Sequence, residues 1–269
     1  MNKQIEKAYA ERPKNTVYQI AVSVIVLACI LWSGSAIEIT KGGTGGLKIA
    51  GNILSGIFHP DAKLLFNLTA QGVPYLLLET VCIAFLGTLV GAFLAIPLSF
   101  LSASNLMPAP VAYVSRLVIM AVRTIPAFVY GLMFIRVSGP GAFTGLLTMS
   151  VCSIGMVSKM YIEAIEDLDT RILESLDACG CTTFQKIRYG ILPQLIPNFA
   201  STVIYRFDIN LRDATVLGLV GAGGIGAPLI FAMNAYRWNE AGAILVGLIA
   251  LVLIVEYIST RIRVKLARG

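Results

Sequence analysis

Five ionisable residues lie within or beside long apolar runs of this 269-residue chain, and their types and spacing suggest two kinds of chemistry. A charged side chain at the centre of a membrane helix costs about 2.5–3.5 kcal/mol, so it normally faces a partner or water. Asp208 and Arg212 are four residues apart and can pair on one helix face. Arg206 lies on a different face, and Arg123 has no acidic neighbour in its own run. The fifth residue is Asp213.

Two hypotheses explain these charges. In the first, Arg123 and Arg206 line a path through the membrane and lower the barrier to an oxyanion, because guanidinium offers paired donors to such groups. In the second, all five residues form an internal network of ion pairs that locks the helices together. The sequence leaves both hypotheses open.

Other catalytic chemistry has little support in the sequence. The segment Gly221-Ala222-Gly223-Gly224-Ile225-Gly226 matches GxGxxG, but the strand and βαβ unit that a dinucleotide site needs are missing. We interpret its glycines as a bend at the outer end of a span, where it could form part of a gate. The chain has one histidine and no CxxC pair, so neither a metal site nor a disulfide framework is indicated. No acid–base or nucleophile constellation indicates an intramembrane enzyme.

The composition is that of a polytopic membrane protein. Hydrophobic residues make up 57% of the chain and charged residues 13%, whereas globular chains carry roughly 25% charged residues. The net charge of +6 does not indicate nucleic-acid binding, because the basic residues flank the apolar runs in small groups.

The apolar runs predict an all-α protein with six membrane-spanning helices of about 20 residues each. The expected spans cover residues 15–37, 80–101, 111–135, from the turn at 138–141 to about 160, 195–219 and 241–258. We expect the first span to be retained, because its apolar run exceeds the roughly 7–15 residues of a signal peptide. Between the first two spans, an amphipathic helix over 50–58 either lies on the outer membrane surface or packs against the bundle.

Lys and Arg residues are concentrated on one side of these spans, which predicts that both termini are cytosolic. The expected organisation has a cytosolic tail over 1–14, the first span with the outer amphipathic segment over 15–74, a membrane core over 75–260, and a basic cytosolic tail over 261–269. A long polar loop at about 163–193 then also lies in the cytosol.

This polar loop predicts two short helices. Asp169 is a good N-cap for the first helix, and Gly180 ends it, since glycine readily takes the left-handed conformation. Thr182 or Thr183 can cap a second turn, and Leu192-Pro193 begins the next span. From the pattern alone, the loop could be a simple connection between two spans.

The spacing within the loop resembles the EAA loop of ABC-importer permeases, in which a Glu, a Gly and a Leu-Pro pair recur. Those positions here are Glu174, Gly180, Leu192 and Pro193, with Ala178 on the same short helix. Two features depart from the pattern. Ser175 and Leu176 replace two alanines, and Gly190 replaces an apolar residue. The resemblance implies a rigid helix that inserts into a groove of a partner ATPase, with Glu174 offering a charge to a basic partner residue.

Further segments resemble the permease subunit of phosphonate ABC importers. They are Arg123 to Pro126, Ser158 to Glu166, Tyr189 to Gln194 and Tyr205 to Gly226. The resemblance implies a type I importer permease in the cell membrane that passes phosphonate or a related oxyanion and has no enzymatic activity or cofactor of its own. It implies a second copy of the chain, two ATPase subunits that bind ATP and Mg, and an extracytoplasmic binding protein. The chain lacks a GxxxxGK[ST] phosphate loop, which fits this division of labour.

The alternative is an ion-coupled secondary transporter or channel that works alone.

Overall fold

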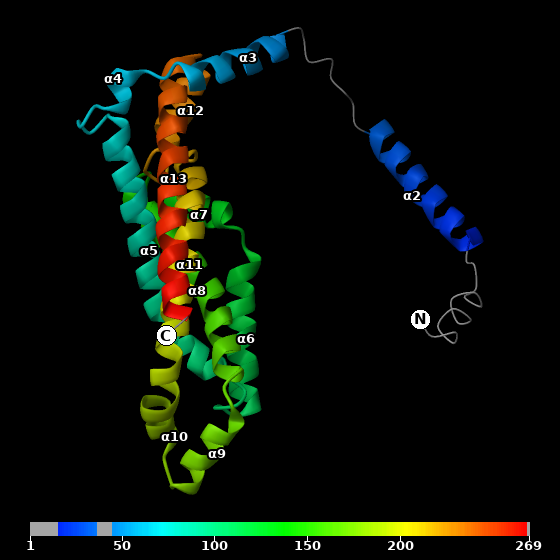
Figure 1. The fold of residues 1–269 in the computed structure, drawn as a ribbon, viewed down its shortest axis with the longest axis vertical. Helices are drawn as coiled ribbons and strands as arrows, with labels where there is room; N and C mark the ends of the chain where they lie inside the picture. Colours follow the sequence, from blue (N-terminus) through cyan, green and yellow to red (C-terminus); the bar gives the residue numbers. More distant parts are fainter. Residues whose placement is uncertain (1–15, 37–44, 268–269) are drawn as a thin grey trace, which may run out of the picture. The chain divides into compact units, whose positions relative to one another are not determined.

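The computed structural model describes residues 16–36 and 45–267, and within those ranges the regular structure is entirely helical (Figure 1). The predicted cytosolic tail over 1–14 lies outside the described residues. The elements are α2 (Thr16–Ala36), α3 (Gly45–Phe58), α4 (Ala62–Leu65), α5 (Val73–Ser102), α6 (Ala109–Thr124), α7 (Ala127–Ser138), α8 (Ala142–Glu166), α9 (Thr170–Ala178), α10 (Thr183–Gln185), the π-helix η1 (Lys186–Ile191), α11 (Leu192–Gly218), α12 (Gly226–Asn234) and α13 (Trp238–Ala267).

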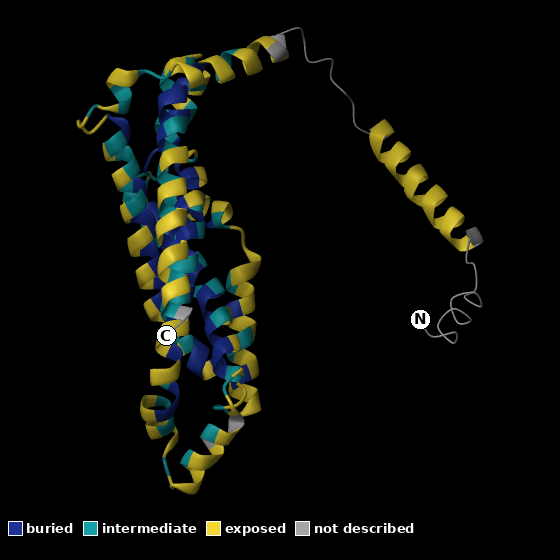
Figure 2. Ribbon diagram, viewed as in Figure 1, coloured by how far each residue is buried: buried dark blue, intermediate teal, exposed yellow. Residues whose placement is uncertain are grey.

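The chain divides into two units, residues 1–50 and 51–269. The first unit contains α2, which matches the predicted first span to within a residue at each end. None of its residues from Tyr18 to Ser35 is buried within the structure, and the helix is exposed all round in Figure 2. A helix that is apolar on every side is typical of a membrane span.

The second unit is a helical bundle around α5, α8 and α11, with α13 alongside, and its buried residues lie between these helices (Figure 2). Two glycines let α5 and α8 pack closely. A Cβ atom at Gly87 would collide with Met149, and one at Gly91 would collide with Ser153. Small residues allow such close approach in membrane helices, where packing rather than the hydrophobic effect drives association.

The end of α3 packs against the start of α13. A Cβ atom at Gly56 would collide with the backbone of Trp238, and one at Gly242 would collide with the backbone of Gly56. This contact agrees with packing of the segment's end against the bundle, and its position relative to the membrane surface stays a prediction.

The predicted third span over 111–135 is not one continuous helix. The structure breaks this segment into α6 and α7, which meet at an angle of 84°. Pro126 lacks an N–H donor, and its ring disfavours helical backbone at the residue before it. Ile125 accordingly adopts an extended conformation, with φ −86° and ψ 122°.

The other helices extend beyond the predicted spans. The second span was expected to begin at Thr80, but α5 begins at Val73 with Pro74 in its first turn, and Glu79 lies inside the helix. Helix α8 continues past Met160 to Glu166. Four described helices are long and apolar enough to cross a membrane, and the bent pair makes a fifth candidate. Since α11 carries four charged residues, the count of six spans stays a prediction.

Candidate functional site

The segment from Asp167 to Ile191, here called the knob, contains α9, α10 and η1 and forms one end of the bundle (Figure 1). Asp169 caps α9, with its side chain accepting a hydrogen bond from the Arg171 backbone N–H at 3.0 Å. Gly180 ends α9 with φ +71°. The Gly180 N–H donates to Asp177 O and the Cys181 N–H to Leu176 O, the two bonds of a Schellman motif. The predicted N-cap and glycine stop are confirmed.

The second half of the knob runs without interruption into α11. Thr182 caps α10 in a reciprocal capping box with Gln185, which confirms one of the two predicted caps. The π-helix η1 follows, and it ends where the Leu192 N–H donates to Ile187 O. Pro193 then lies in the first turn of α11. A proline ring crowds the carbonyl four residues earlier, and a π-turn relieves that crowding by shifting the hydrogen bonds by one residue.

Leu176 and Gly190, two of the three residues that depart from the EAA pattern, contact each other across the knob. A Cβ atom at Gly190 would collide with Leu176 Cδ1. The larger residue on α9 is therefore matched by the smallest residue on η1. This contact joins α9 to the segment that leads into α11, and the ion pair between Lys186 and Asp177 at 2.5 Å joins the same two segments.

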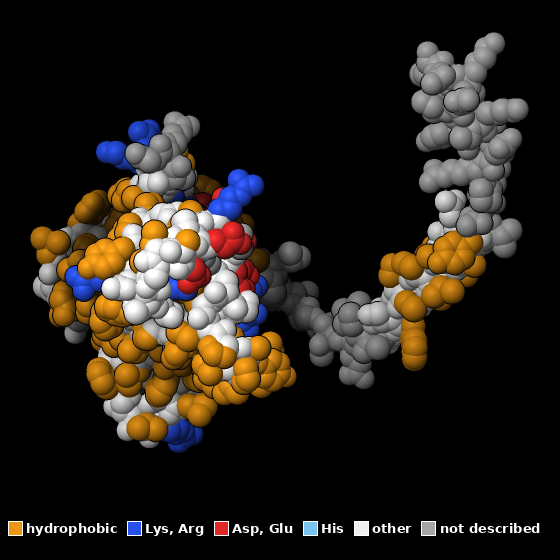
Figure 3. All heavy atoms as spheres, turned by 90° about the horizontal axis from the view of Figure 1, so that it is seen from below, with side chains coloured by type: hydrophobic (Ala, Val, Ile, Leu, Met, Phe, Trp, Pro, Cys, Tyr) orange, Lys and Arg blue, Asp and Glu red, His pale blue; other side chains and the backbone are white. Residues whose placement is uncertain are grey.

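The outer surface of the knob carries Glu174 and Ala178, both exposed. In the part of the chain that the structure describes, Glu174 makes no ion pair. Seen from the end that carries α9 and α10, charged side chains lie among polar and hydrophobic ones (Figure 3). The carboxylate of Glu174 is therefore available to a partner in the adjacent water.

The knob is anchored in a cluster of buried side chains at the ends of α5, α8 and α11. Tyr161 and Phe199 stack with their ring centroids 3.8 Å apart, and Ile191, Leu195 and Ile165 are buried beside them. Ile187 and Leu168, which lie in the knob itself, pack on the same cluster. The knob therefore packs directly on the ends of three helices of the bundle.

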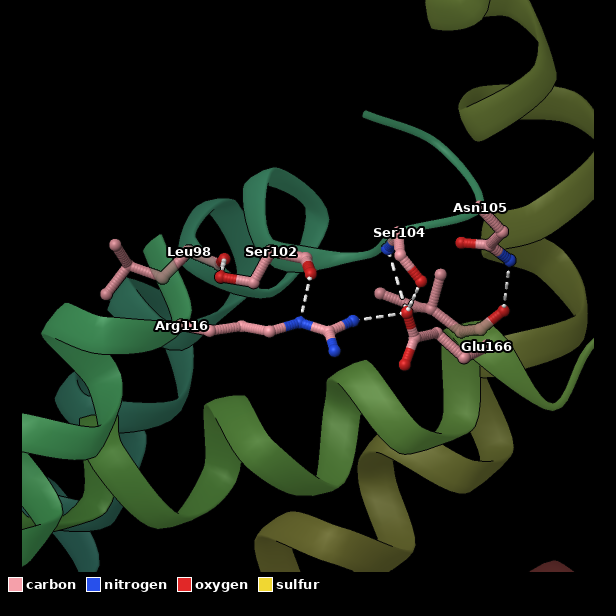
Figure 4. A network of polar contacts seen from close by, with 7 residues as sticks. Leu98, Ser102, Ser104, Asn105, Arg116 and Glu166 are labelled. Carbon is pink, nitrogen blue, oxygen red and sulfur yellow. Dashed lines mark hydrogen bonds and ion pairs between the residues drawn. The ribbon is translucent and has the colours of Figure 1, made fainter. Parts of the chain in front are cut away.

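A polar contact that sequence reasoning missed fixes the base of the knob (Figure 4). One carboxylate oxygen of Glu166, at the end of α8, accepts hydrogen bonds from Arg116 and from the hydroxyl and backbone N–H of Ser104. The Arg116 Nε donates to Ser102 O at 2.9 Å, and the Asn105 amide donates to Ile165 O at 2.9 Å. These residues, called the latch below, hold the α5–α6 connection and α6 against the end of α8.

Four of the five candidate intramembrane charges lie together on α11. Arg212 pairs with Asp208 at 2.9 Å and with Glu256 of α13 at 3.5 Å. Arg206 lies 3.9 Å from Asp213, an acidic partner two turns along the helix that the four-residue rule does not cover. The side chains of Arg206 and Asp208 are 9% and 7% exposed.

Arg123 is not part of this group. It is an exposed residue in the last turn of α6, and no carboxylate among the described residues lies within 4.0 Å of it. Arg123 therefore lies outside the ion pairs of α11 among the described residues.

A buried polar bridge at the centre of the bundle was also absent from the sequence analysis. The amide nitrogen of Asn210 donates to Thr88 of α5 and to Ser153 of α8, both at 2.7 Å. All three residues are buried. The only signal in the sequence was a polar amide within a mostly apolar helix, and its partners are distant in the chain.

The glycine segment forms a tightly packed bend, as predicted. Gly221, Gly223 and Gly224 have φ values of +95°, +81° and +74°, and Gly226 begins α12. The Gly141 N–H donates to Gly221 O at 2.9 Å, and the Ile225 N–H donates to the Thr80 hydroxyl at 3.0 Å. Residues 16–36 and 45–267 contain no group of three or more His, Cys, Asp or Glu that could hold a metal ion.

Comparison with known proteins identifies relatives along most of the chain. A family model described as "Binding-protein-dependent transport system inner membrane component" matches residues 95–268. The putative phosphite transport system permease protein HtxC of Stutzerimonas stutzeri is 33% identical over 98% of this chain and 94% of its own length. The phosphate-import permease protein PhnE of Mycolicibacterium smegmatis is 36% identical over 70% of this chain and 36% of its own length.

Solved structures share the fold at lower identity. A chain of the MetNI methionine ABC transporter in an inward-facing conformation superimposes with a TM-score of 0.64 at 20% identity, covering 70% of this chain and 93% of that one. A chain of a bacterial ABC transporter involved in the import of alginate gives a TM-score of 0.52 at 17% identity, covering 92% of this chain and 98% of that one. The resemblance to importer permeases is confirmed at the level of family and fold.

Proposed function

We propose that this chain, which belongs to the family of binding-protein-dependent transport system inner membrane components, is the permease of an ATP-driven importer for phosphite, phosphonate or phosphate. It is a multi-pass membrane protein, given this family and its apolar helices. The substrate class is supported by the names of two relatives, a phosphite permease from S. stutzeri with 36% identity and a phosphate-import permease from M. smegmatis.

The observation that carries the proposal is the construction of the knob. It presents a short capped helix with an exposed Glu174, and its inner side is anchored to α5, α8 and α11. We propose that an ATPase grips α9, and that its movement on binding ATP and Mg enters the bundle through the Leu176–Gly190 contact and the start of α11. The five coupling residues are then Glu174, Ala178, Gly180, Leu192 and Pro193.

The remaining subunits are part of the same proposal. A second permease copy completes the transport path, two ATPase subunits bind the two knobs, and an extracytoplasmic binding protein delivers the substrate. The core over 75–260 forms the path, both termini are cytosolic, and the glycine bend at Gly221–Gly226 forms part of the outer gate. The chain itself performs no catalysis and needs no cofactor.

Reconstitution of the permease with its ATPase and binding protein in proteoliposomes tests the proposal. Glu174→Arg and Gly180→Val are expected to abolish ATP-driven uptake of phosphite or phosphonate, because the first reverses the charge offered to the partner. Gly180→Val places a β-branched residue at φ +71°, where such residues are outliers. Lys63→Glu is the matched charge reversal at an exposed residue of α4, outside the knob, and should leave uptake unchanged.

The same preparation separates import from the alternative of a stand-alone transporter. We expect no uptake from liposomes that contain the permease alone, whether or not an ion gradient is applied. Uptake by the permease alone, or full ATP-driven uptake by both knob variants, would show that the proposal is wrong.

A further inference from the structure

A groove of about 300 Å³ lies between α6 and α8, beside the latch. Each helix contributes one stripe of residues spaced by three or four positions, so that the stripes face each other across the groove. The middle of the groove is apolar, with Ile119, Met120 and Ile162, and its charged lining residues are Arg116, Arg123, Lys159, Glu163 and Glu166.

The charges in this groove do not balance. Three cations face two carboxylates. Glu166 is paired with Arg116, and Glu163 lies 3.3 Å from Lys159. Arg123 has no carboxylate within 4.0 Å among the residues that the structure describes. One positive charge is therefore left over, and it belongs to Arg123.

The three cations differ in how freely they can bind a ligand. Arg116 is committed to the latch, where it donates to both Glu166 and Ser102 O. Lys159 and Glu163 are about half exposed, and an exposed pair four residues apart on a helix is weak. Lys159 can therefore exchange Glu163 for a ligand anion, whereas Arg116 stays in place.

The packing of α8 makes room for Arg123. A Cβ atom at Gly155 would lie 2.6 Å from Arg123 Cγ, so the missing side chain lets the stem of the arginine lie against α8. Arg123 is among the residues that line the groove. Its planar arrangement of donors matches phosphorus oxyanions through paired hydrogen bonds.

From this geometry we propose that the groove is a binding site for a phosphorus oxyanion, held by paired donors of Arg123 and by the charge of Lys159. Two sources share this chemistry. One is the head group of an anionic phospholipid, whose acyl chains would extend along the apolar side of α6. The other is free phosphate or phosphonate. The site is separate from the coupling residues of the knob. Its free-anion alternative rests on the proposed substrate class, whereas its lipid alternative does not.

Two binding measurements on the purified full-length chain distinguish the sources. In nanodiscs of neutral phosphatidylcholine, inorganic phosphate is titrated and its dissociation constant is measured by calorimetry. In a second preparation, phosphatidylglycerol is added and retained lipid is counted by native mass spectrometry. Arg123→Gln is expected to weaken binding about tenfold or more in whichever preparation shows it, because hydrogen bonds between charged groups are the strong ones. Lys159→Gln should cause a smaller loss.

Arg136→Gln is the matched control, since Arg136 occupies the last turn of α7 as Arg123 occupies that of α6, and is likewise exposed. Arg123→Gln should keep the thermal stability of the wild type in neutral lipid, because it breaks no ion pair. Phosphate binding alone identifies free anion as the ligand, phosphatidylglycerol retention alone identifies lipid, and both together support the shared chemistry. Three results would overturn the proposal. The first is no binding in either preparation, and the second is equal binding by Arg123→Gln and the wild type. The third is a loss of binding in Arg136→Gln as large as that in Arg123→Gln.

Discussion

The glycine bend and the knob lie at opposite ends of α11, and they are held together by different kinds of contact (Figure 1). At the bend, the closest contacts of Gly223 and Gly226 are with backbone atoms, and the Thr80 side chain meets Gly224. A Cβ atom at Gly223 would lie 2.7 Å from the N and Cα atoms of Ala142, and one at Gly226 would lie 2.7 Å from backbone atoms of Gly218 and Leu219. Such contacts leave no space for a side chain at these two positions.

The knob is held by side chains instead. A Cβ atom at Gly180 would meet nothing within 4 Å, and one at Gly190 would meet only the Leu176 side chain. Ion pairs of Lys186 with Asp177 and of Arg116 with Glu166 complete the contacts. Side chains can change rotamers and exchange partners more easily than backbones can shift. The proposed coupling role of the knob predicts side-chain contacts of this kind.

The largest expected effect is that of Gly223→Ala at the bend. An L-residue in the left-handed region costs about 1–2 kcal/mol, and overpacking against the Ala142 backbone adds about 1–3 kcal/mol. We expect a clear fall in the thermal unfolding temperature of the purified protein, with little folded protein recovered.

Gly139→Ala provides the control for the packing contribution to that effect. Gly139 has φ +79°, close to the +81° of Gly223, but a Cβ atom there would meet nothing within 4 Å. Both variants place an L-residue at a positive φ. The ψ of 171° puts Gly139 in a region used essentially by glycine alone, so its conformational cost is at least as large, and only Gly223→Ala adds a collision. Equal losses of stability would mean that the close backbone contact at the bend is unimportant, and the contrast between the two ends would fail.

Local patterns in the sequence predicted much of both ends. The caps at Asp169 and Thr182, the stop at Gly180 and the bend at Gly221–Gly226 follow from conformational preferences of single residues, and each is present. These features depend on neighbours in the chain, which a sequence displays directly.

Contacts between distant segments were not predictable in this way. The sequence marks Arg116 and Glu166 only as charges that flank spans, and nothing in their spacing indicates that they bond. Pro126 was visible, yet the 84° angle depends on how α7 packs after the break. Leu176 and Gly190 were each recognised as departures from a pattern, but only the fold shows that they compensate each other.

Gly190→Leu tests that compensation and is expected to have an intermediate effect. The new side chain would occupy the space of Leu176, at a cost of about 1–3 kcal/mol in stability. Transport should fall because α9 is displaced from η1. Adding Leu176→Ala empties the space, and the double variant should recover part of the lost stability and transport.

The coupling free energy between the two sites, measured by a double-mutant cycle on unfolding, should be about 0.5–3 kcal/mol and favourable. As a control, the same Leu176→Ala change is combined with Gly139→Ala, which lies outside the knob, and should be additive. If the changes in unfolding free energy of the Leu176 and Gly190 substitutions were additive, a direct contact between the two residues would be contradicted.

The smallest losses of stability are expected for Gly180→Ala and Gly180→Asn, where only the backbone conformation matters. Gly180→Ala should cost about 1–2 kcal/mol, since alanine tolerates the left-handed region poorly. Gly180→Asn should cost less, because asparagine visits that region more readily than other residues with a side chain. The measurement is the affinity of the purified permease for its ATPase, together with thermal unfolding. Because the space around Gly180 is open, size should be irrelevant and asparagine should be tolerated better than alanine. If alanine were the better substitute, the glycine would be required for space rather than for conformation, and the knob would resemble the bend.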